Sequence, residues 1–468
     1  MKYGKMARTV SLVLGTCLLM AHAETAPVKV FILSGQSNMV GMGRVSGGGQ
    51  RWGSEFIDPV VSVYEGAYDP AADYETMTPI EALKLESFGG AQPTPYPGGG
   101  THVTRGFVNV KEDGIYLFRP GYGASMDCLM EVDGQVVHSK KAGQEAVRTK
   151  IKMTAGQKVP FKITYLNEGA NGLGWLERID PPGALSTLVF YQGMYPYLVD
   201  DAGNWVERDD VYYKGVVSDT GSRWLGVGDD AIGPELGFGI KVGNALDEPV
   251  LILKTSQGNR ALGWDFLPPG SKQYEYDGKI YAGYKDSPLS WEKGTEPEPI
   301  NWYAGKQYDE CFSTAHEVLD HFDQQFPHWK GRKYEIVGFG WWQGDKDRYD
   351  AGLASRYETN LVYLIKTLRK EFNAPEAKFV VATLGQTPTD IEIEDATAQN
   401  EKWILDAQLA VDGDLGKYPE FKGNVRTIYT YPLSQGGASN GHYNRHAQTY
   451  MDVGLAMGEM MVQLLEKE

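Results

Sequence analysis

The sequence predicts an α/β fold built on a doubly wound parallel sheet and interrupted by an all-β insertion. Two observations indicate the sheet: short runs rich in apolar and β-branched residues recur along the chain, and amphipathic helical patterns separate several of them. A third observation indicates the insertion, because a long region rich in Gly and Pro carries only short alternating runs. A chain of 468 residues is expected to form two domains.

Five runs suit the interior of a parallel sheet that is covered on both faces. They are residues 28–34, 249–254, 335–340, 378–383 and 424–429. Apolar residues also recur at helical spacing in three segments, which are residues 312–326, 361–372 and 453–464. Strands and helices in this βαβ order predict a flavodoxin-like, three-layer, doubly wound fold.

The insertion is predicted to be a β-sandwich. Its strand-like pieces are residues 106–110, 114–118, 128–134 and 159–165, and its densest Pro and Gly run is residues 92–100. Asp133-Gly134 predicts a hairpin turn between two of the strands. The predicted division is therefore a main domain of residues 24–46 and 185–468, with residues 47–184 inserted.

Residues 1–23 are predicted to be a cleaved signal peptide. Basic residues precede an apolar run at 10–20, and Ala21-His22-Ala23 matches the small-x-small rule for cleavage. The apolar run is too short to span a bilayer, so the mature protein is expected to be secreted, either periplasmic or extracellular. A net charge of −16 makes nucleic acid and anionic membranes poor partners.

The sequence contains no metal or cofactor motif, and no cofactor is expected. Asp345-x-Asp347 lacks the remaining ligands of a calcium loop. Cys128 and Cys311 lie too far apart in sequence to indicate a disulfide framework, and the sequence leaves open whether they pair. It also leaves the oligomeric state open.

Reactive side chains follow four of the five predicted strands. They are Ser37, residues 257–260, residues 341–345 and residues 440–444. Ligands of an open parallel sheet bind beyond the carboxyl ends of its strands, so these loops are expected to converge. Ser37 is the candidate nucleophile, because Gly35 permits a sharp bend after the first strand. These residues alone fit an ordinary turn with a capping serine equally well.

His442 is the candidate general base for Ser37. A serine hydroxyl needs a neighbouring base, and the unperturbed pKa of histidine suits that role near neutral pH. His446 is the weaker alternative, because the chain is then expected to be entering its last helix. His316 and His321 lie five residues apart and so do not share a helix face as a metal-binding pair would.

Gly35-Gln36-Ser37-Asn38-Met39 resembles the nucleophile block of the sialate O-acetylesterase and acetylxylan-esterase-like branch of the SGNH hydrolases. The segment 341–345 resembles a second specific block of that branch. This resemblance implies a secreted serine esterase that removes acetyl groups from a carbohydrate. The insertion loosely resembles the protective-antigen-type β-sandwich, which implies glycan binding; the alternative is a structural insertion that shapes the rim of the active site.

The resemblance also implies an oxyanion hole, formed by the backbone N–H groups of Ser37 and Gly258 and by the side-chain amide of Gln343. Four further residues are candidates for substrate binding, namely Trp341, Trp342, Asn259 and Arg260. At least one of the two tryptophans is expected to pack in the core or rim, and the other can stack on a sugar ring.

One departure from the family concerns the residue that orients the imidazole. The family usually has an aspartate three residues before the histidine, and this chain has Ser439 there. Ser439 or a backbone carbonyl can orient the ring as a dyad, or Asp345 can replace the aspartate; Asp345 is favoured as the third catalytic residue. Two other functions remain open: a catalytically inactive glycan-binding protein, and an esterase for non-carbohydrate esters.

Overall fold

The computed structural model describes residues 26–466 except 46–49, 53–55, 85–99, 111–113, 117, 122–126, 168–174, 179–182, 191 and 229. The predicted signal peptide at 1–23 and most of the Pro and Gly run at 92–100 lie outside the described residues.

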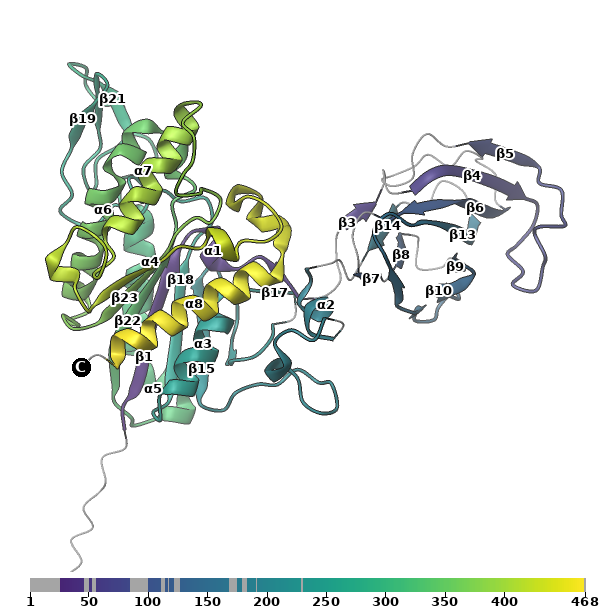
Figure 1. Ribbon diagram of the computed structural model, residues 1–468, viewed down its shortest axis with the longest axis horizontal. Helices are drawn as coiled ribbons and strands as arrows, with labels where there is room; N and C mark the ends of the chain where they lie inside the picture. Colours follow the sequence, from purple (N-terminus) through teal and green to yellow (C-terminus); the bar gives the residue numbers. More distant parts are fainter. Residues whose placement is uncertain are drawn as a thin grey trace, which may run out of the picture.

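The described residues form a seven-stranded, mostly parallel sheet in the order β16-β15-β18-β1-β22-β23-β24 (Figure 1). The strands are β1 Val28–Gly35, β15 Val211–Val217, β16 Ser222–Trp224, β18 Val250–Ser256, β22 Tyr334–Trp342, β23 Lys378–Ala382 and β24 Val425–Ile428. The five predicted strands lie in the flavodoxin-like order, with the first strand between the second and third. The predicted fold class is therefore confirmed, and β15 and the antiparallel β16 extend the sheet on one side.

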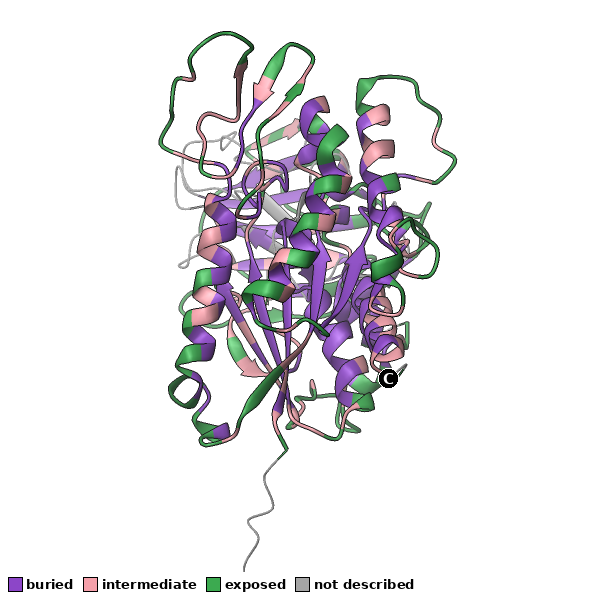
Figure 2. Ribbon diagram, turned by 90° about the vertical axis from the view of Figure 1, so that its left-hand side faces the viewer, coloured by how far each residue is buried: buried purple, intermediate pink, exposed green. Residues whose placement is uncertain are grey.

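Helices cover both faces of this sheet (Figure 2). They are α1 Ser37–Val40, α2 Leu185–Phe190, α3 Pro234–Ala245, α4 Lys306–Asp320, α5 Phe322–Gln325, α6 Ala351–Glu371, α7 Ala396–Ala410 and α8 Ala447–Leu465. Val30 and Ile32 of β1 pack in one core with α4, α6 and α7, whereas Phe31 and Leu33 pack in the other with α3 and α8. This alternation explains why β1 is apolar throughout: both of its faces are buried.

Short 3₁₀ helices lie in the connections, at η1 Pro196–Leu198, η2 Pro327–Trp329, η3 Asp347–Tyr349, η4 Pro419–Phe421, η5 Tyr431–Leu433 and η6 Ser439–Arg445. The helical patterns at 361–372 and 453–464 are confirmed by α6 and α8. The pattern at 312–326 is divided, because α4 ends at Asp320 and a separate short helix, α5, carries Phe322.

The insertion is an all-β unit, as predicted. Its main antiparallel sheet has the order β11-β10-β9-β13-β6-β4-β5, and two small sheets, β3-β14-β8 and β12-β7, accompany it. The strands are β3 Gln50–Trp52, β4 Phe56–Tyr64, β5 Glu81–Lys84, β6 Gly100–Asn109, β7 Gly114–Tyr116, β8 Phe118–Gly121, β9 Cys128–Val132, β10 Gln135–Lys140, β11 Val147–Arg148, β12 Ile151–Met153, β13 Lys158–Asn167 and β14 Trp175–Arg178. The hairpin turn is confirmed, with positive φ at Asp133 and Gly134. The limits 47 and 184 stay predictions.

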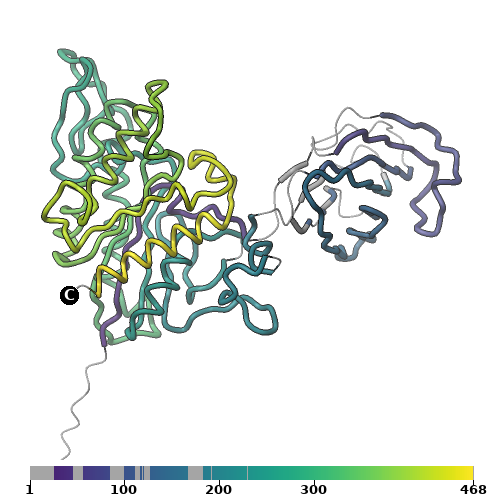
Figure 3. Tube along the Cα trace, viewed as in Figure 1, coloured from purple at the N-terminus to yellow at the C-terminus, as the bar shows by residue number. Residues whose placement is uncertain are grey.

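The two ends of the insertion meet at the main domain (Figure 3). The backbone N–H of Ser186 donates to the carbonyl of Val45 at 2.9 Å, and the N–H of Ala447 donates to the carbonyl of Gly183 at 2.7 Å. Beside this junction, β2 Gly43–Arg44 pairs with β17 Ala231–Ile232. A further hairpin sheet consists of β19 Tyr274–Tyr276, β20 Lys279–Tyr281 and β21 Ser290–Glu292.

Cys128 and Cys311 are both free and buried, so they do not pair. Burial raises the pKa of the Cys311 thiol to about 11, which leaves it protonated at neutral pH. In the part of the chain that the structure describes, no helix has the length and apolarity needed to cross a membrane.

Candidate active site

The nucleophile turn begins where β1 ends. Gly35 has φ +151°, and a Cβ at this position would lie 2.2 Å from the carbonyl oxygen of Trp342, so only glycine fits here. The chain then enters α1, in which Ser37 is the first residue and is 8% exposed. The predicted bend thus places Ser37 at the carboxyl edge of the sheet, next to the central strand.

His442 approaches Ser37 from the far end of the chain. Its Nε2 lies 2.9 Å from Oγ of Ser37, although 405 positions separate the two residues. His442 belongs to η6, which lies between β24 and α8. The structure therefore brings the candidate nucleophile and the candidate base into hydrogen-bond contact. His446 lies elsewhere, with its ring against Gly183.

The turn that carries His442 has an unusual backbone. Four consecutive residues, His442 to Arg445, have φ between 48° and 61°, a left-handed conformation that costs non-glycine residues roughly 1–2 kcal/mol each. Tyr443 holds the turn: it is fully buried, and its hydroxyl donates to the carbonyl of Leu384. The hydroxyl of Tyr450 also donates to the carbonyl of His442, at 3.3 Å. Packing thus maintains a strained turn at the place where the imidazole must be positioned.

Gly258 lies beside Ser37, as predicted. A Cβ at Gly258 would lie 3.6 Å from Cβ of Ser37, so the backbone after β18 runs alongside the nucleophile. Asn259 is exposed with φ 57°, and Arg260 bonds the side chain of Gln307 at 2.9 Å and stacks on Trp302. Arg260 is therefore engaged within the protein, whereas Asn259 faces solvent.

The expected oxyanion role of Gln343 does not fit its contacts. Its side chain is fully buried, and Nε2 donates to the carbonyl of Arg260 at 2.9 Å and to Oδ2 of Asp347 at 2.6 Å. Tyr357 donates to its Oε1, which fixes the orientation of the amide. Both amide hydrogens are thus used inside the protein, so Gln343 braces the loops around the site instead of offering a donor to an oxyanion.

Asp347 is fully buried, and no role was predicted for it beyond the incomplete calcium-loop pattern Asp345-x-Asp347. Its carboxylate accepts the N–H groups of Leu262 and Gly263, each at 2.8 Å, in addition to the amide of Gln343. Burial raises its pKa to about 6, although these hydrogen bonds oppose the change. Asp347 joins the loop after β18 to the loop after β22.

The structure does not place Asp345 against the imidazole. Its Oδ1 accepts Nε of Arg348 at 2.8 Å and Oγ of Ser439 at 3.4 Å. The Nδ1 of His442 has no hydrogen-bond partner among the residues that the structure describes. The favoured third catalytic residue is therefore corrected: the contacts are those of a Ser37–His442 dyad, and Asp345 belongs to an ion-pair network.

That network lies next to the dyad. Arg348 also pairs with Glu401 at 2.8 Å, and Gln386 accepts both the N–H and the hydroxyl of Ser439. Burial lowers the pKa of Arg348, but the nearby carboxylates of Asp345 and Glu401 outweigh this and raise it overall. Ser439 is thus held three residues before His442 by an amide and a neutralised carboxylate.

Trp341 and Trp342 are both fully buried, so the core packing expected for at least one of them holds for both, and neither can stack on a sugar ring. Trp341 packs edge-on against Phe266 in one core. Trp342 stacks on Tyr443, with 5.9 Å between ring centroids, in the other core. Trp342 therefore supports the turn that carries His442 through its contact with Tyr443.

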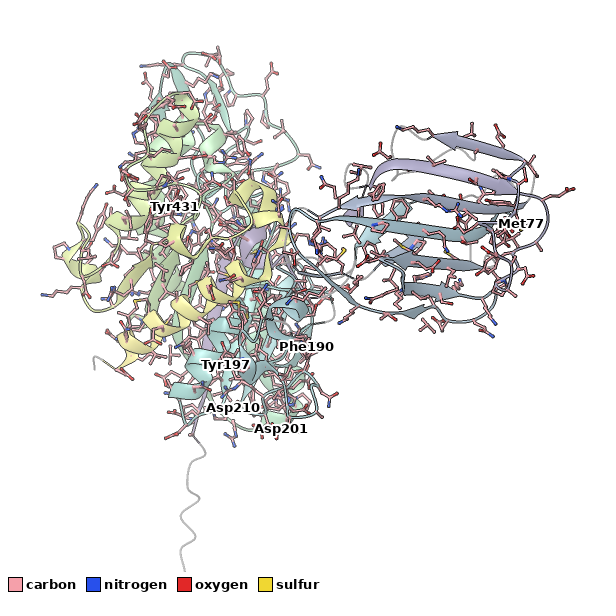
Figure 4. All side chains as sticks on the ribbon, turned by 45° about the vertical axis from the view of Figure 1, so that its right-hand side comes forward. Met77, Phe190, Tyr197, Asp201, Asp210 and Tyr431 are labelled. Carbon is pink, nitrogen blue, oxygen red and sulfur yellow. The ribbon has the colours of Figure 1, made fainter. Side chains whose placement is uncertain are left out.

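Exposed aromatic side chains do lie in loops at this edge of the sheet. Tyr431, labelled in Figure 4, follows β24, is 44% exposed and stacks on Tyr429. Tyr349 follows β22 and is 61% exposed. Gln36, for which no separate role was predicted, connects the nucleophile turn to the loop after β22. Its Oε1 accepts the N–H groups of Gly344 and Lys346.

No group of three or more His, Cys, Asp or Glu side chains within the described ranges is arranged to hold a metal ion. The reactive groups of the site are a hydroxyl, an imidazole and backbone donors. Together they can support acyl transfer through a covalent serine intermediate.

Residues 286–460 match the family model described as "carbohydrate esterase, sialic acid-specific acetylesterase". The family recognised from the sequence motifs is thereby confirmed. The matched segment of the sialic acid-specific acetylesterase family contains His442, Asp345 and Gln343, and the fold brings Ser37 and Gly258 to it from outside that segment.

Several solved structures are similar to the chain at low identity. A carbohydrate acetylesterase from Xanthomonas citri has 12% identity and a TM-score of 0.36, with 77% of this chain and 73% of that one covered. A protein from Arabidopsis thaliana has 16% identity and a TM-score of 0.34, with 55% and 82% covered. A carbohydrate esterase family 2 enzyme with a carbohydrate-binding domain, from Corynascus thermopiles (Myceliophthora fergusii), has 10% identity and a TM-score of 0.26, with 81% and 98% covered. No curated protein matches the chain.

Proposed function

We propose that this chain is a secreted serine esterase that removes O-acetyl groups from a carbohydrate, either an acetylated polysaccharide or an acetylated sialic acid. The observation that carries the proposal is the 2.9 Å contact between Oγ of Ser37 and Nε2 of His442. Membership of residues 286–460 in a carbohydrate esterase family supports it, because that family implies an acetylated carbohydrate as substrate.

In the proposed reaction, Oγ of Ser37 attacks the carbonyl carbon of the acetyl ester while Nε2 of His442 takes the hydroxyl proton. The backbone N–H groups of Ser37 and Gly258 stabilise the oxyanion that forms. The bond from the acyl carbon to the sugar oxygen then breaks, and the imidazolium gives its proton to that oxygen. A water molecule, deprotonated by the same imidazole, then attacks the acetyl-serine. The bond from the acyl carbon to Oγ breaks, the imidazolium returns its proton to Oγ of Ser37, and acetate leaves.

The exposed tyrosines supply the proposed contact with the sugar ring in place of the buried tryptophans. Tyr431 and Tyr349 lie on loops at the carboxyl edge of the sheet, and an aromatic face can pack against the apolar face of a pyranose. Secretion rests on the N-terminal residues 1–23, with cleavage proposed after Ala23. N-terminal sequencing of exported protein checks this, and Glu24 is the expected first residue.

The decisive experiment is hydrolysis of p-nitrophenyl acetate by the wild type and by Ser37→Ala. We expect the substitution to reduce kcat at least about a thousandfold without unfolding the protein, because it removes the atom that forms the covalent bond. Ser355→Ala, on the exposed face of α6, is the matched control and should retain activity. A fluorophosphonate should label Ser37 in the wild type, as mass spectrometry can establish.

Acetate release from acetylated xylan and from an O-acetylated sialic acid then assigns the substrate. A wild type that neither hydrolyses p-nitrophenyl acetate nor reacts with the fluorophosphonate would support an inactive glycan-binding protein instead. Hydrolysis of the chromogenic ester without release of acetate from any carbohydrate would favour an esterase for other esters.

A further inference from the structure

Lys254 is a buried cation directly behind the nucleophile turn. It lies on β18, is 1% exposed, and donates from Nζ to the carbonyl of Val40 at 2.7 Å and to Oε2 of Glu235 at 2.8 Å. Val40 is the last residue of α1, the helix that begins with Ser37, and Glu235 lies in the first turn of α3. One ammonium group therefore joins three elements beneath the candidate active site.

A buried ion pair of this kind needs a reason other than stability. Taking two charges out of water carries a large desolvation penalty, and well-packed apolar residues often replace such a pair with no loss of stability. Burial lowers the pKa of Lys254, but the Glu235 carboxylate outweighs this and raises it above the ordinary value. The ammonium is therefore charged at neutral pH. Besides Val40 and Glu235, Nζ also faces the ring of Tyr213, with 5.2 Å between Nζ and the ring centroid.

The backbone around the pair is packed too closely for any side chain. A Cβ on Gly233 would lie 2.3 Å from Oε2 of Glu235 and 3.0 Å from Cα of Gly41. Gly41 follows α1 directly, and the N–H of Gly233 donates to Oε1 of Glu235 at 3.0 Å. The end of α1 thus rests on Gly233, and Glu235 holds Gly233 in place.

We propose that Lys254 and Glu235 are positioning residues for Ser37, an inference that rests on the proposed esterase function. Helix α1 has only four residues, so fixing the carbonyl of Val40 fixes the direction of the whole turn, including Ser37 at its start. Lys254 also lies four residues before Gly258, which follows the end of β18. The pair therefore holds the nucleophile in register with both His442 and the proposed oxyanion donor.

The test removes both charges at once in the full-length protein. Lys254→Met with Glu235→Gln leaves no unpaired ion, so folding should persist. We expect kcat on p-nitrophenyl acetate to fall about 10- to 100-fold while KM changes less than about twofold, because misplacement of a reacting group by about 1 Å can cost about a hundredfold. The rate of fluorophosphonate labelling of Ser37 should fall by the same factor.

Lys241→Met with Glu459→Gln is the matched control. This ion pair has the same composition and joins the same helix, α3, to α8, but it is partly exposed and lies away from α1. It should leave kcat and labelling unchanged. A folded Lys254→Met/Glu235→Gln protein with wild-type kcat and labelling rate would overturn the inference.

Lys254→Met with Glu235→Leu keeps the proposal testable if the first double variant does not fold, because apolar residues often replace a buried ion pair without loss of stability. It also removes the carboxylate that holds Gly233, so we expect at least about a tenfold lower kcat at unchanged KM. Wild-type kcat in this variant would also overturn the inference. An inactive wild type that the fluorophosphonate does not label would instead contradict the esterase function itself, which separates the two failures.

Discussion

Two histidines four positions apart compete for the role of base, and their surroundings differ. Nε2 of His442 contacts Oγ of Ser37, whereas the ring of His446 packs against Gly183. We expect His442→Ala to reduce kcat by orders of magnitude, comparably to Ser37→Ala, and His446→Ala to leave it within a few-fold of the wild type. Steady-state hydrolysis of p-nitrophenyl acetate measures both. The opposite ranking would show that His446 is the base.

The residue that orients His442 can be identified with two substitutions. Asp345→Asn should lower kcat less than about tenfold, because the Asp345 carboxylate pairs with Arg348 and does not contact the imidazole. A loss of several orders of magnitude with unchanged KM would instead restore Asp345 as the third catalytic residue.

Ser439→Asp complements that experiment. A carboxylate at 439 has the spacing that the family uses, but Oγ of Ser439 lies 3.4 Å from Asp345, so two like charges would meet. We therefore expect Ser439→Asp to raise kcat several-fold only when it is combined with Asp345→Asn. Comparison of the double variant with Asp345→Asn, on the same chromogenic acetate, measures the gain. No gain would mean that the left-handed turn does not present Nδ1 to position 439.

At the scale of residues, the sequence predicted that Ser37, His442 and Gly258 lie together at the carboxyl edge of the sheet, because the ends of parallel strands meet at one edge. It could not predict the direction of single side chains. The amide of Gln343 is oriented by Arg260 and Asp347, and the carboxylate of Asp345 by Arg348. These partners lie in two loops, one after β18 and one after β22, and no local pattern records them. The burial of Trp341 and Trp342 likewise follows from the helices that pack on both faces of β22.

At the scale of elements, Asp347 couples the loops after β18 and β22, and this coupling should depend on pH. Its pKa is raised from 3.8 to about 6 by burial, so the folded state binds the proton more tightly than the unfolded chain does. Ionisation of Asp347 therefore lowers the free energy of unfolding as pH rises from about 4 to 6, by up to about 3 kcal/mol, and the penalty is constant above pH 6.

Urea unfolding of the wild type and of Asp347→Asn at pH 4, 5, 6 and 7 checks this. The asparagine does not titrate, so the stability of the wild type relative to the variant should decrease as pH rises through that window and then level off. A relative stability that increases with pH between 4 and 6 would mean that hydrogen bonds to the carboxylate, and not its burial, dominate.

Elements with a clear period were predicted and those without one were missed. The stripe of α6 is regular because one face meets the sheet and the other meets solvent. In α3, nine of twelve residues are buried, so its sequence shows no polar face. The helix at 312–326 was predicted as continuous, yet α4 ends at Asp320 and a second short helix follows. The apolar pattern did not show this break, because apolar residues on both sides of it pack into the same core.

For the whole molecule, the closeness of the two ends of the insertion allows the insertion to be removed. The carbonyl of Val45 and the N–H of Ser186 are 2.9 Å apart, so a short linker can replace residues 47–184 without stretching the main domain. If the insertion targets the enzyme to polymeric substrate, deletion should leave kcat/KM on p-nitrophenyl acetate within a few-fold and lower acetate release from acetylated xylan by about tenfold or more. Equal losses on both substrates would make the insertion part of the active-site wall.

The central position of β1 has a consequence for how the protein is made. This strand leaves the ribosome first, yet its two partners are β18 and β22, and the second begins about 300 residues later. At about 5–20 residues per second, the edge of this eight-residue apolar strand that pairs with β22 stays unpaired for roughly 15–60 s of translation. The described strands of the inserted β unit pair with one another, and all of them are synthesised well before then. The inserted unit can therefore complete its sheet during synthesis before the main domain can, and one edge of β1 is open to pairing with other chains until β22 emerges.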